Sequence, residues 1–178
     1  MRCESKKGYA SMEIRRLNRA DAAAYRALRL RAFRDHPEAF TSSFEEADRL
    51  PLAASEMRLS VEHHKFWGAF EDGQLCGMIG LERETRLKNQ HKGTVVAMYV
   101  PPERTRRGIG LALLDALVED ARQSGIELLV LTVTHGNSSA AKLYERAGFR
   151  SFGIEPRAIK IDGRAYARNH MYFELVPS

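Results

Sequence analysis

A turn rich in arginine and glycine, residues 101–110, is the segment of this sequence best suited to chemistry. It follows an apolar run, residues 94–100, and leads into a helical pattern that begins at Gly108. Where a strand passes through a glycine turn into a helix, unpaired backbone N–H groups and the positive end of the helix dipole point outward together. The sequence therefore predicts a phosphate-binding turn. Its glycines and arginines are Gly108, Gly110, Arg104, Arg106 and Arg107.

This turn does not match the two commonest nucleotide-binding signatures. The Lys-Ser or Lys-Thr pair of a triphosphate loop is absent at the required spacing, and the third glycine of a dinucleotide fingerprint is missing because Leu111 follows Gly110 directly. Short glycine motifs constrain function loosely, so the segment alone is also compatible with a helix start that carries surface arginines. A second segment is needed to choose between these interpretations.

The second segment, residues 132–149, contains a strand end, Asn137, and a helical pattern that finishes in Leu143-Tyr144-Glu145 and then Gly148-Phe149. Together, the two segments resemble the GNAT superfamily of acetyltransferases. The first resembles that family's acetyl-CoA motif, which has Arg or Gln, two variable residues, Gly, one variable residue, and Gly or Ala. The second resembles its downstream strand–helix motif. Thr105 occupies the position usually held by Arg or Gln, so positive charge must come from the neighbouring arginines.

The resemblance implies acetyl-CoA as cosubstrate, without a metal, and a role for each matching residue. The pantetheine arm is expected between splayed strands at residues 94–100 and 127–134, held by main-chain groups of Met98 and Val100. The Val100 N–H is expected to stabilise the oxyanion, and Tyr144 to protonate the leaving thiolate as a general acid. Tyr144 could instead be an apolar-stripe residue, and Asn137 only a helix cap. The other implied cofactor contacts are Thr105, Arg106, Arg107, Gly108, Ile109, Gly110, Leu111, Asn137 and Tyr144.

The general base is less clearly indicated by the sequence. The central strand has no carboxylate, so the candidates are Glu82 and Glu84, at the end of the preceding strand, and His135, just past the next one. Glu82 is the preferred candidate. Charged residues at strand ends are ordinarily exposed, so a solvated surface role remains the alternative for all three.

The acceptor pocket is expected between the first helix with its following loop and the last hairpin. Phe33, Phe40 and Arg157 are the candidate substrate-binding residues. The resemblance predicts an N-acetyltransferase that acts on a primary amine of a small molecule, an amino acid or a peptide, by direct attack in a ternary complex. Two alternatives remain open, an enzyme that uses a longer acyl-CoA and a sensor that binds acyl-CoA without transferring it.

The hydrophobic periodicity predicts the elements that position these residues. It indicates a strand at 12–17, a helix capped by Asp21, an irregular link at 39–44, a weaker helix at 51–63 and a hairpin at 66–81. Strand, helix, strand and helix follow, and a hairpin turns at Asp162-Gly163. The first of these two helices is expected to place one apolar stripe inward, formed by Leu111, Leu114, Leu117, Val118 and Ala121. With the resemblance, this predicts an α/β (α+β) fold with a GNAT-like mixed, mostly antiparallel twisted sheet of about seven strands and about four helices. Residues 12–178 are expected to form one domain, after a flexible tail at 1–11.

Composition restricts the location and the partners only broadly. The chain has 178 residues and a net charge of +5, which suits an anionic partner without naming one. Its basic residues are scattered, so nucleic acid is not expected, and no window is apolar enough to predict a membrane span. Two cysteines far apart, Cys3 and Cys76, favour a reducing, cytoplasmic setting. His63-His64 and His91 lack the spacing of a metal site, and the assembly is undetermined, with a homodimer left open.

Overall fold

The seven strands in the described part of the chain join one twisted sheet. The computed structural model describes residues 12–175, so the predicted tail at 1–11 lies outside the described part. The strand order is β1-β2-β3-β4-β5-β7-β6, and every neighbouring pair is antiparallel except β4 and β5. The predicted mixed, mostly antiparallel sheet is therefore confirmed. The strands are β1 Met12–Arg16, β2 His64–Glu71, β3 Gln74–Arg83, β4 Lys92–Tyr99, β5 Leu128–Thr134, β6 Arg150–Ile161 and β7 Arg164–Glu174.

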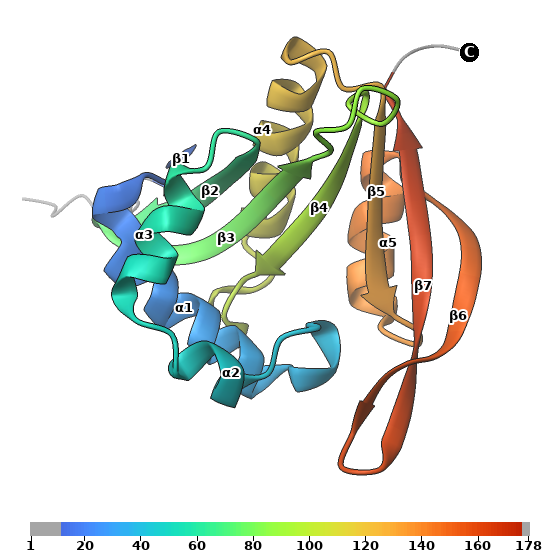
Figure 1. Ribbon diagram of the computed structural model, residues 1–178, viewed down its shortest axis with the longest axis horizontal. Coiled ribbons are helices and arrows are strands. Elements are labelled where there is room, and N and C mark those ends of the chain that lie inside the picture. The colour runs from blue at the N-terminus through green and yellow to red at the C-terminus, as the bar shows by residue number, and fades with distance from the viewer. Residues whose placement is uncertain (1–11, 176–178) are drawn as a thin grey trace, which may run out of the picture.

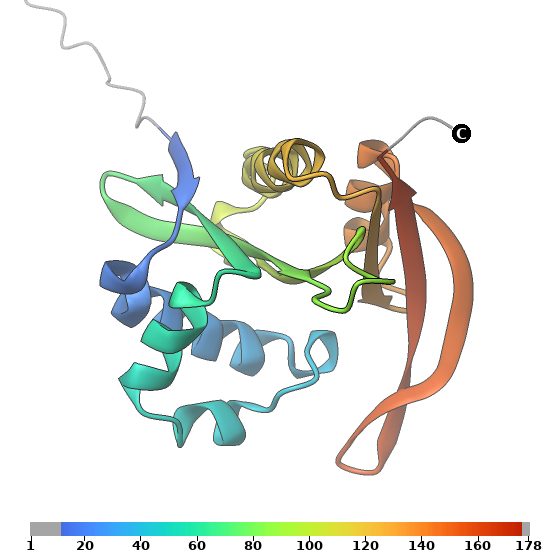
Figure 2. The same ribbon diagram turned by 45° about the horizontal axis from the view of Figure 1, so that its top comes forward.

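Helices cover both faces of this sheet, as Figures 1 and 2 show. One face carries α1 Ala22–Asp35, α2 Phe44–Asp48 and α3 Leu52–Ser60, and the opposite face carries α4 Ile109–Gln123 and α5 Ser138–Ala147. Each layer has its own hydrophobic cluster, one under α1 and α3 and a larger one under α4 and α5. Three short 3-10 helices connect elements: η1 Arg19–Asp21, η2 Pro37–Ala39 and η3 Pro102–Arg104.

The local signals placed most elements correctly, with three differences. The segment at 39–44 runs into the short helix α2, capped by Ser43, which accepts a hydrogen bond from the Glu46 N–H at 3.1 Å. Asp21 precedes α1 but caps nothing there, because its carboxylate binds Arg15 at 2.8 and 2.9 Å. Leu111 does not belong to the buried stripe of α4. Its side chain is 41% exposed, whereas Leu113 and Leu114 are fully buried.

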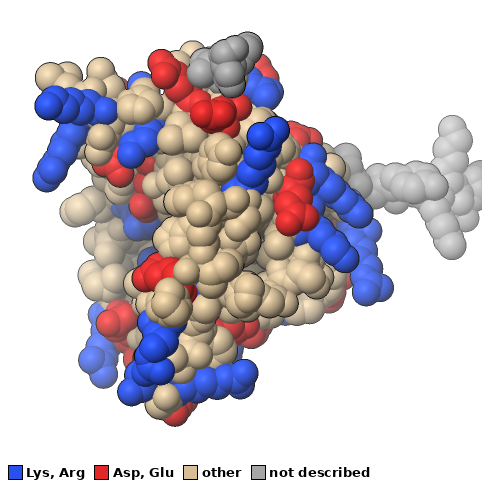
Figure 3. Space-filling model, turned by 90° about the vertical axis from the view of Figure 1, so that its right-hand side faces the viewer, with Lys and Arg blue, Asp and Glu red and all other residues tan. Residues whose placement is uncertain are grey.

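The edge strand β6 carries an exposed apolar surface. Phe152 is 61% exposed and Ile154 is 47% exposed. The Phe152 ring packs against His170 and Tyr172 of β7. Figure 3 views the side of the molecule to which β6 belongs, where uncharged residues fill the centre and charged residues gather toward the rim. Such an edge strand is open to pairing with another chain.

Candidate active site

The two parallel strands β4 and β5 separate after a short paired stretch. Residues Lys92 to Thr94 pair with Leu128 to Val130, and the ladder between the two strands ends there. In Figure 1 the strands diverge toward their carboxyl ends. The second half of β4 therefore offers backbone hydrogen-bonding groups on the side that faces β5. This is the separation between 94–100 and 127–134 that the resemblance implies.

A β-bulge lies in the separated half of β4. Gly80 and Met78 of β3 pair with Val96 and Tyr99, so three steps along β4 oppose two along β3. Ala97 absorbs the extra residue with a φ of 56°, a left-handed conformation that is uncommon for a residue with a side chain. A bulge redirects backbone groups out of the regular ladder. Here it does so beside Met98, in the part of β4 that no longer pairs with β5.

The predicted phosphate-binding turn follows β4 directly. Gly108 has a φ of 77° and Arg106 a φ of 62°, and α4 begins at the next residue after Gly108. Within residues 12–175, the N–H groups from Arg106 to Leu111 donate to no backbone carbonyl. Gly110 allows α4 to pack closely against α5, because a Cβ there would lie only 3.3 Å from Leu143 of α5. The turn thus presents a row of free N–H donors next to the helix that carries Tyr144.

Two of the three turn arginines are held by a buried carboxylate. Glu71, the last residue of β2, is only 4% exposed. Its oxygens pair with the guanidinium of Arg104 and with that of Arg107, at 2.8 and 3.0 Å in the second case. Arg106 is exposed and forms no ion pair with the part of the chain that is described. Sequence reasoning treated the three arginines as equivalent, and the structure separates them into two that brace the turn and one that faces solvent.

Comparison with known proteins now identifies the family. A family model described as "Acetyltransferase (GNAT) family" matches residues 23–149, which is more than half of the chain. The chain belongs to the GNAT family. The matched range includes β4, β5, the turn between β4 and α4, and α5.

Relatives of this GNAT chain include acetyltransferases with different acceptors. It is 33% identical over 88 residues to an L-methionine sulfoximine/L-methionine sulfone acetyltransferase of Pseudomonas paraeruginosa, covering 49% of this chain and 51% of that one. It is 28% identical to the mycothiol acetyltransferase of Beutenbergia cavernae, covering 76% and 43%. The chain thus spans about half, or less, of the length of these curated relatives.

Solved structures agree with the GNAT fold. An acetyltransferase of the GNAT family from Streptococcus pneumoniae superimposes with a TM-score of 0.84 at 24% identity, covering 92% of this chain and 99% of that one. A putative acetyltransferase from Salmonella typhimurium, solved with its cofactor acetyl-CoA, gives a TM-score of 0.78 at 23% identity, covering 94% and 96%. At these identities the likeness establishes the fold.

In this GNAT fold, Tyr144 is buried on the α5 face that packs against the sheet. It is 6% exposed, and its ring meets Phe149 edge-on at 5.6 Å between centroids. Burial raises the pKa of the Tyr144 phenol well above its ordinary value, so the proton is retained at neutral pH. Asn137 accepts a hydrogen bond from the Ala140 N–H at 3.2 Å, which makes it the N-cap of α5. Asn137 therefore does cap the helix. A contact between the rest of its amide group and the cofactor stays a prediction.

The candidate bases differ in their surroundings. Glu82 lies near the end of β3 and accepts a hydrogen bond from Arg58 of α3 at 2.7 Å. One of its two oxygens is therefore already occupied, while the side chain keeps 33% exposure. Glu84 and His135 are exposed. Of the three candidates, Glu82 is thus the one held in place by a neighbouring side chain, that of Arg58.

The predicted acceptor residues are only partly brought together. Phe33 and Phe40 stack edge-on at 5.1 Å between ring centroids, but Phe33 is 4% exposed and belongs to the core. Arg157 lies in the irregular part of β6, where it is exposed and has a φ of 55°. Phe40, which is half-buried, remains better placed for contact with a substrate than Phe33.

Sequence reasoning missed the contacts that tie α1 to the end of β4. The Tyr99 hydroxyl donates to Asp35 at 2.5 Å, and Arg31 binds Glu103 through two bonds of 2.6 and 2.7 Å. The Arg31 hydrogen bonds lower the pKa of Glu103 to about 2. These partners lie 64 and 72 residues apart, so no local pattern reveals them.

Within residues 12–175, no group of three or more His, Cys, Asp or Glu side chains is arranged to hold a metal ion. Across the same range, no helix is both long and apolar enough to cross a membrane.

Proposed function

We propose that the protein is an N-acetyltransferase that moves the acetyl group of acetyl-CoA to a primary amine in a ternary complex. The observation that carries this proposal is the row of free N–H groups at 106–111, placed directly after the separated, bulged half of β4. A pyrophosphate on that turn would direct the pantetheine arm into the opening between β4 and β5. The acetyl-CoA held by the Salmonella relative supports the choice of cosubstrate.

The chemistry requires three groups from the chain. The amine nitrogen attacks the thioester carbonyl, and a backbone N–H, with Val100 as our choice, donates to the oxygen that becomes negative. The carbon–sulfur bond then breaks, and Tyr144 gives its proton to the departing thiolate. A base removes the proton that the ammonium group must lose, and Glu82 is our candidate for this step, directly or through water.

In this proposal, backbone groups form the hydrogen bonds to the cofactor and arginine side chains supply the positive charge. The N–H groups of Arg106, Arg107, Gly108, Ile109 and Gly110 bind the pyrophosphate, and Met98 holds the arm through its main chain. Thr105 contributes no charge, so the arginines beside it supply the positive field. Leu111 is exposed at the first turn of α4, where it can cover part of the cofactor.

Release of free thiol from acyl-CoA tests this function. Acetyl-CoA and longer acyl-CoA thioesters are each offered with a panel of amino acids, polyamines and peptides. Thiol release that requires both acetyl-CoA and an amine, with the N-acetyl product found by mass spectrometry, supports an N-acetyltransferase. A preference for longer chains supports the longer-acyl alternative. Tight acetyl-CoA binding with no release for any amine contradicts the proposal and favours a sensor. A cytoplasmic location and a homodimer remain predictions.

A further inference from the structure

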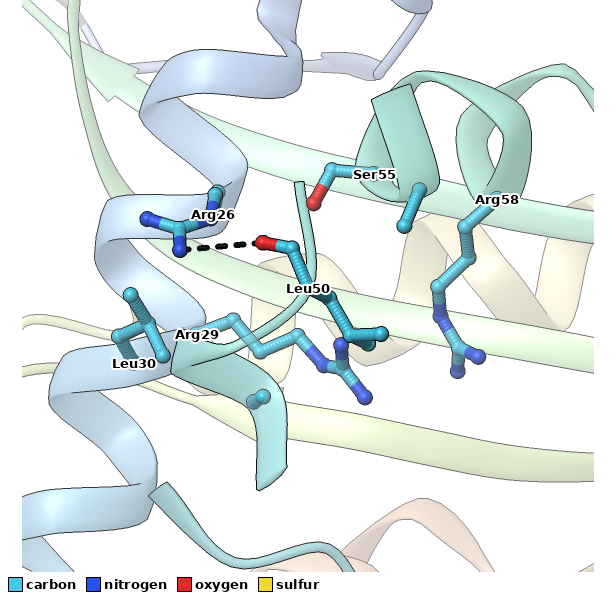
Figure 4. Close-up of a pocket in the computed structure, with 8 residues that line it drawn as sticks. Arg26, Arg29, Leu30, Leu50, Ser55 and Arg58 are labelled. Atoms are coloured by element: carbon cyan, nitrogen blue, oxygen red, sulfur yellow. Dashed lines mark hydrogen bonds between the residues drawn. The ribbon is translucent and has the colours of Figure 1, made fainter. Parts of the chain in front are cut away.

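A cavity lies between α1, α2 and α3, and its lining combines apolar side chains with arginines. Its volume is about 190 Å³, many times the roughly 10–15 Å³ that one water molecule needs. Three guanidinium groups line it, those of Arg26, Arg29 and Arg58. Figure 4 shows Arg29 reaching from α1 toward α3 and Arg58 pointing down from α3 into the same space, with the Ser55 hydroxyl above them. Guanidinium groups that converge on one space make it a favourable place for an anion.

The three arginines differ in how far their charge is already satisfied. Arg26 donates to the carbonyls of Asp48 and Leu50 at 2.9 and 3.2 Å and to the Asp48 carboxylate at 3.4 Å, so it joins α1 to the loop before α3. Arg58 donates to Glu82 at 2.7 Å and to the Tyr25 hydroxyl at 3.2 Å. Both are therefore committed, Arg26 to the backbone and Arg58 in part to Glu82.

Arg29 has no such partner. Counting only residues 12–175, no carboxylate lies within 4.0 Å of its guanidinium, which rests instead over the Phe33 ring at 4.9 Å from the centroid. Burial lowers the pKa of Arg29 from its ordinary value, and the charge of Arg58 lowers it further. An arginine nevertheless stays protonated in proteins, so the half-buried Arg29 brings to this cavity a positive charge that no carboxylate of the described residues pairs with.

This cavity also adjoins the proposed chemistry. Arg58 binds Glu82, our candidate base, and Glu82 pairs across the sheet with Thr94 of β4. Three residues further along β4 lies the bulge at Ala97, a distance of about 10 Å along a strand. A small molecule anchored at Arg29 therefore lies on the face of the sheet from which an acceptor can approach the thioester.

We infer that Arg29, assisted by Arg58, binds the carboxylate of the acceptor, so the substrate class is an amino acid or another small amine that carries a carboxylate. This inference rests on the proposed function. A guanidinium fork matches a carboxylate in geometry as well as charge, and the cavity is too small for a folded partner. The methionine sulfoximine acetyltransferase relative is named for an amino acid derivative, which agrees with this class.

Matched acids and amides test the inference. The wild type, Arg29→Gln and Arg29→Lys are assayed with amino acids and with the corresponding amino acid amides, which keep the amine and lose the carboxylate. Wild type should prefer the acids. Arg29→Gln should lose about 10- to 100-fold in kcat/KM for the acids, mainly through KM, and little for the amides. Arg29→Lys should recover part of the loss. Arg34→Gln, a charge loss on the exposed side of the same helix, should change neither.

A binding experiment separates failure of this inference from failure of the proposed function. N-acetylated amino acids and their amides cannot react, and calorimetry measures their binding in the presence of coenzyme A. Acid-selective binding that Arg29→Gln abolishes supports the carboxylate site even if no amine is acetylated. The inference is overturned if wild type binds and acetylates acids and amides equally, or if Arg29→Gln weakens both equally while the thermal midpoint is unchanged.

Discussion

The proposed cofactor side and the proposed acceptor side of this protein are built in different ways. The cofactor side uses consecutive backbone groups, since the bulge at Ala97, the N–H row at 106–111 and the cap at Asn137 all lie within or beside single elements. The acceptor side uses side chains that meet across the fold, such as Arg58 with Glu82 and Arg26 with Asp48. Backbone geometry tolerates changes of side chain, whereas a pocket of converging side chains changes with each substitution.

This difference explains how one fold can serve different acceptors. A pyrophosphate bound by N–H groups requires only the turn and the helix start. An acceptor bound by Arg29 and Arg58 requires particular residues on α1 and α3. The relatives are named for compounds as different as methionine sulfone and mycothiol, as expected if the cofactor side stays constant while the acceptor side varies. Substitutions on the two sides should therefore have separable effects.

The largest effect is expected for Tyr144→Phe. Loss of the hydroxyl should lower kcat by at least about 100-fold, since general acids typically contribute that much. The Kd for acetyl-CoA should be unchanged, because the ring still packs against Phe149. Burial raises the pKa of Tyr144, so its acid form should persist in wild type throughout the neutral range. Tyr172→Phe on β7 is the matched control, and an unchanged kcat in Tyr144→Phe would remove this residue from the mechanism.

Arg107→Gln should mainly lower stability, whereas Arg106→Gln should mainly weaken cofactor binding. Arg107→Gln leaves Glu71 with one partner fewer, so the free energy of unfolding should fall by about 1–2 kcal/mol. Arg106→Gln should leave stability unchanged and weaken acetyl-CoA binding by up to about 10-fold, with a smaller dependence of Kd on salt. Calorimetry and urea denaturation measure the two quantities. Equal effects of both variants on both quantities would mean that the turn arginines act as a single set after all.

Two glycines with the same backbone conformation give a sharper test of the N–H row. Gly108 has a φ of 77° and Gly125 a φ of 72°, and a Cβ at either position would meet nothing within 4 Å. Changing either to Ala should cost about 1–2 kcal/mol of stability, because a side chain disfavours this conformation. Only Gly108→Ala should also weaken acetyl-CoA binding, since Gly125 lies beyond the far end of α4. If both variants weaken binding alike, the loss reflects stability and not the turn.

The sequence predicted features that depend on neighbouring residues better than contacts that form across the fold. The strand-turn-helix at 94–110 and the cap and stop of α5 could be predicted because each depends on residues that are neighbours in the chain. The role of Glu71 could not, since it precedes the turn residues Asp72 and Gly73 and resembles an exposed residue, while its arginine partners lie 33 and 36 residues away. Phe33 was predicted to contact substrate, and the structure buries it at 4% exposure. Helical spacing shows that an aromatic residue faces inward, but not whether it meets a cavity or the core.

The smallest effect should appear where the two sides are joined, at Arg31 and Glu103. The folded-state pKa of Glu103 is about 2, against an ordinary value of 4.5. A depressed pKa gives stability that is present above pH 4.5 and is lost as the pH falls toward 2. Glu103→Gln should therefore be less stable than wild type at neutral pH, and the difference should shrink over that window. Glu119→Gln, at an exposed position of α4, is the control. Asp21 and Asp35 also have lowered pKa values, so the difference between wild type and variant is the quantity to follow. Parallel stability curves for wild type and Glu103→Gln would show that the Arg31 contact contributes nothing to joining α1 to the cofactor turn.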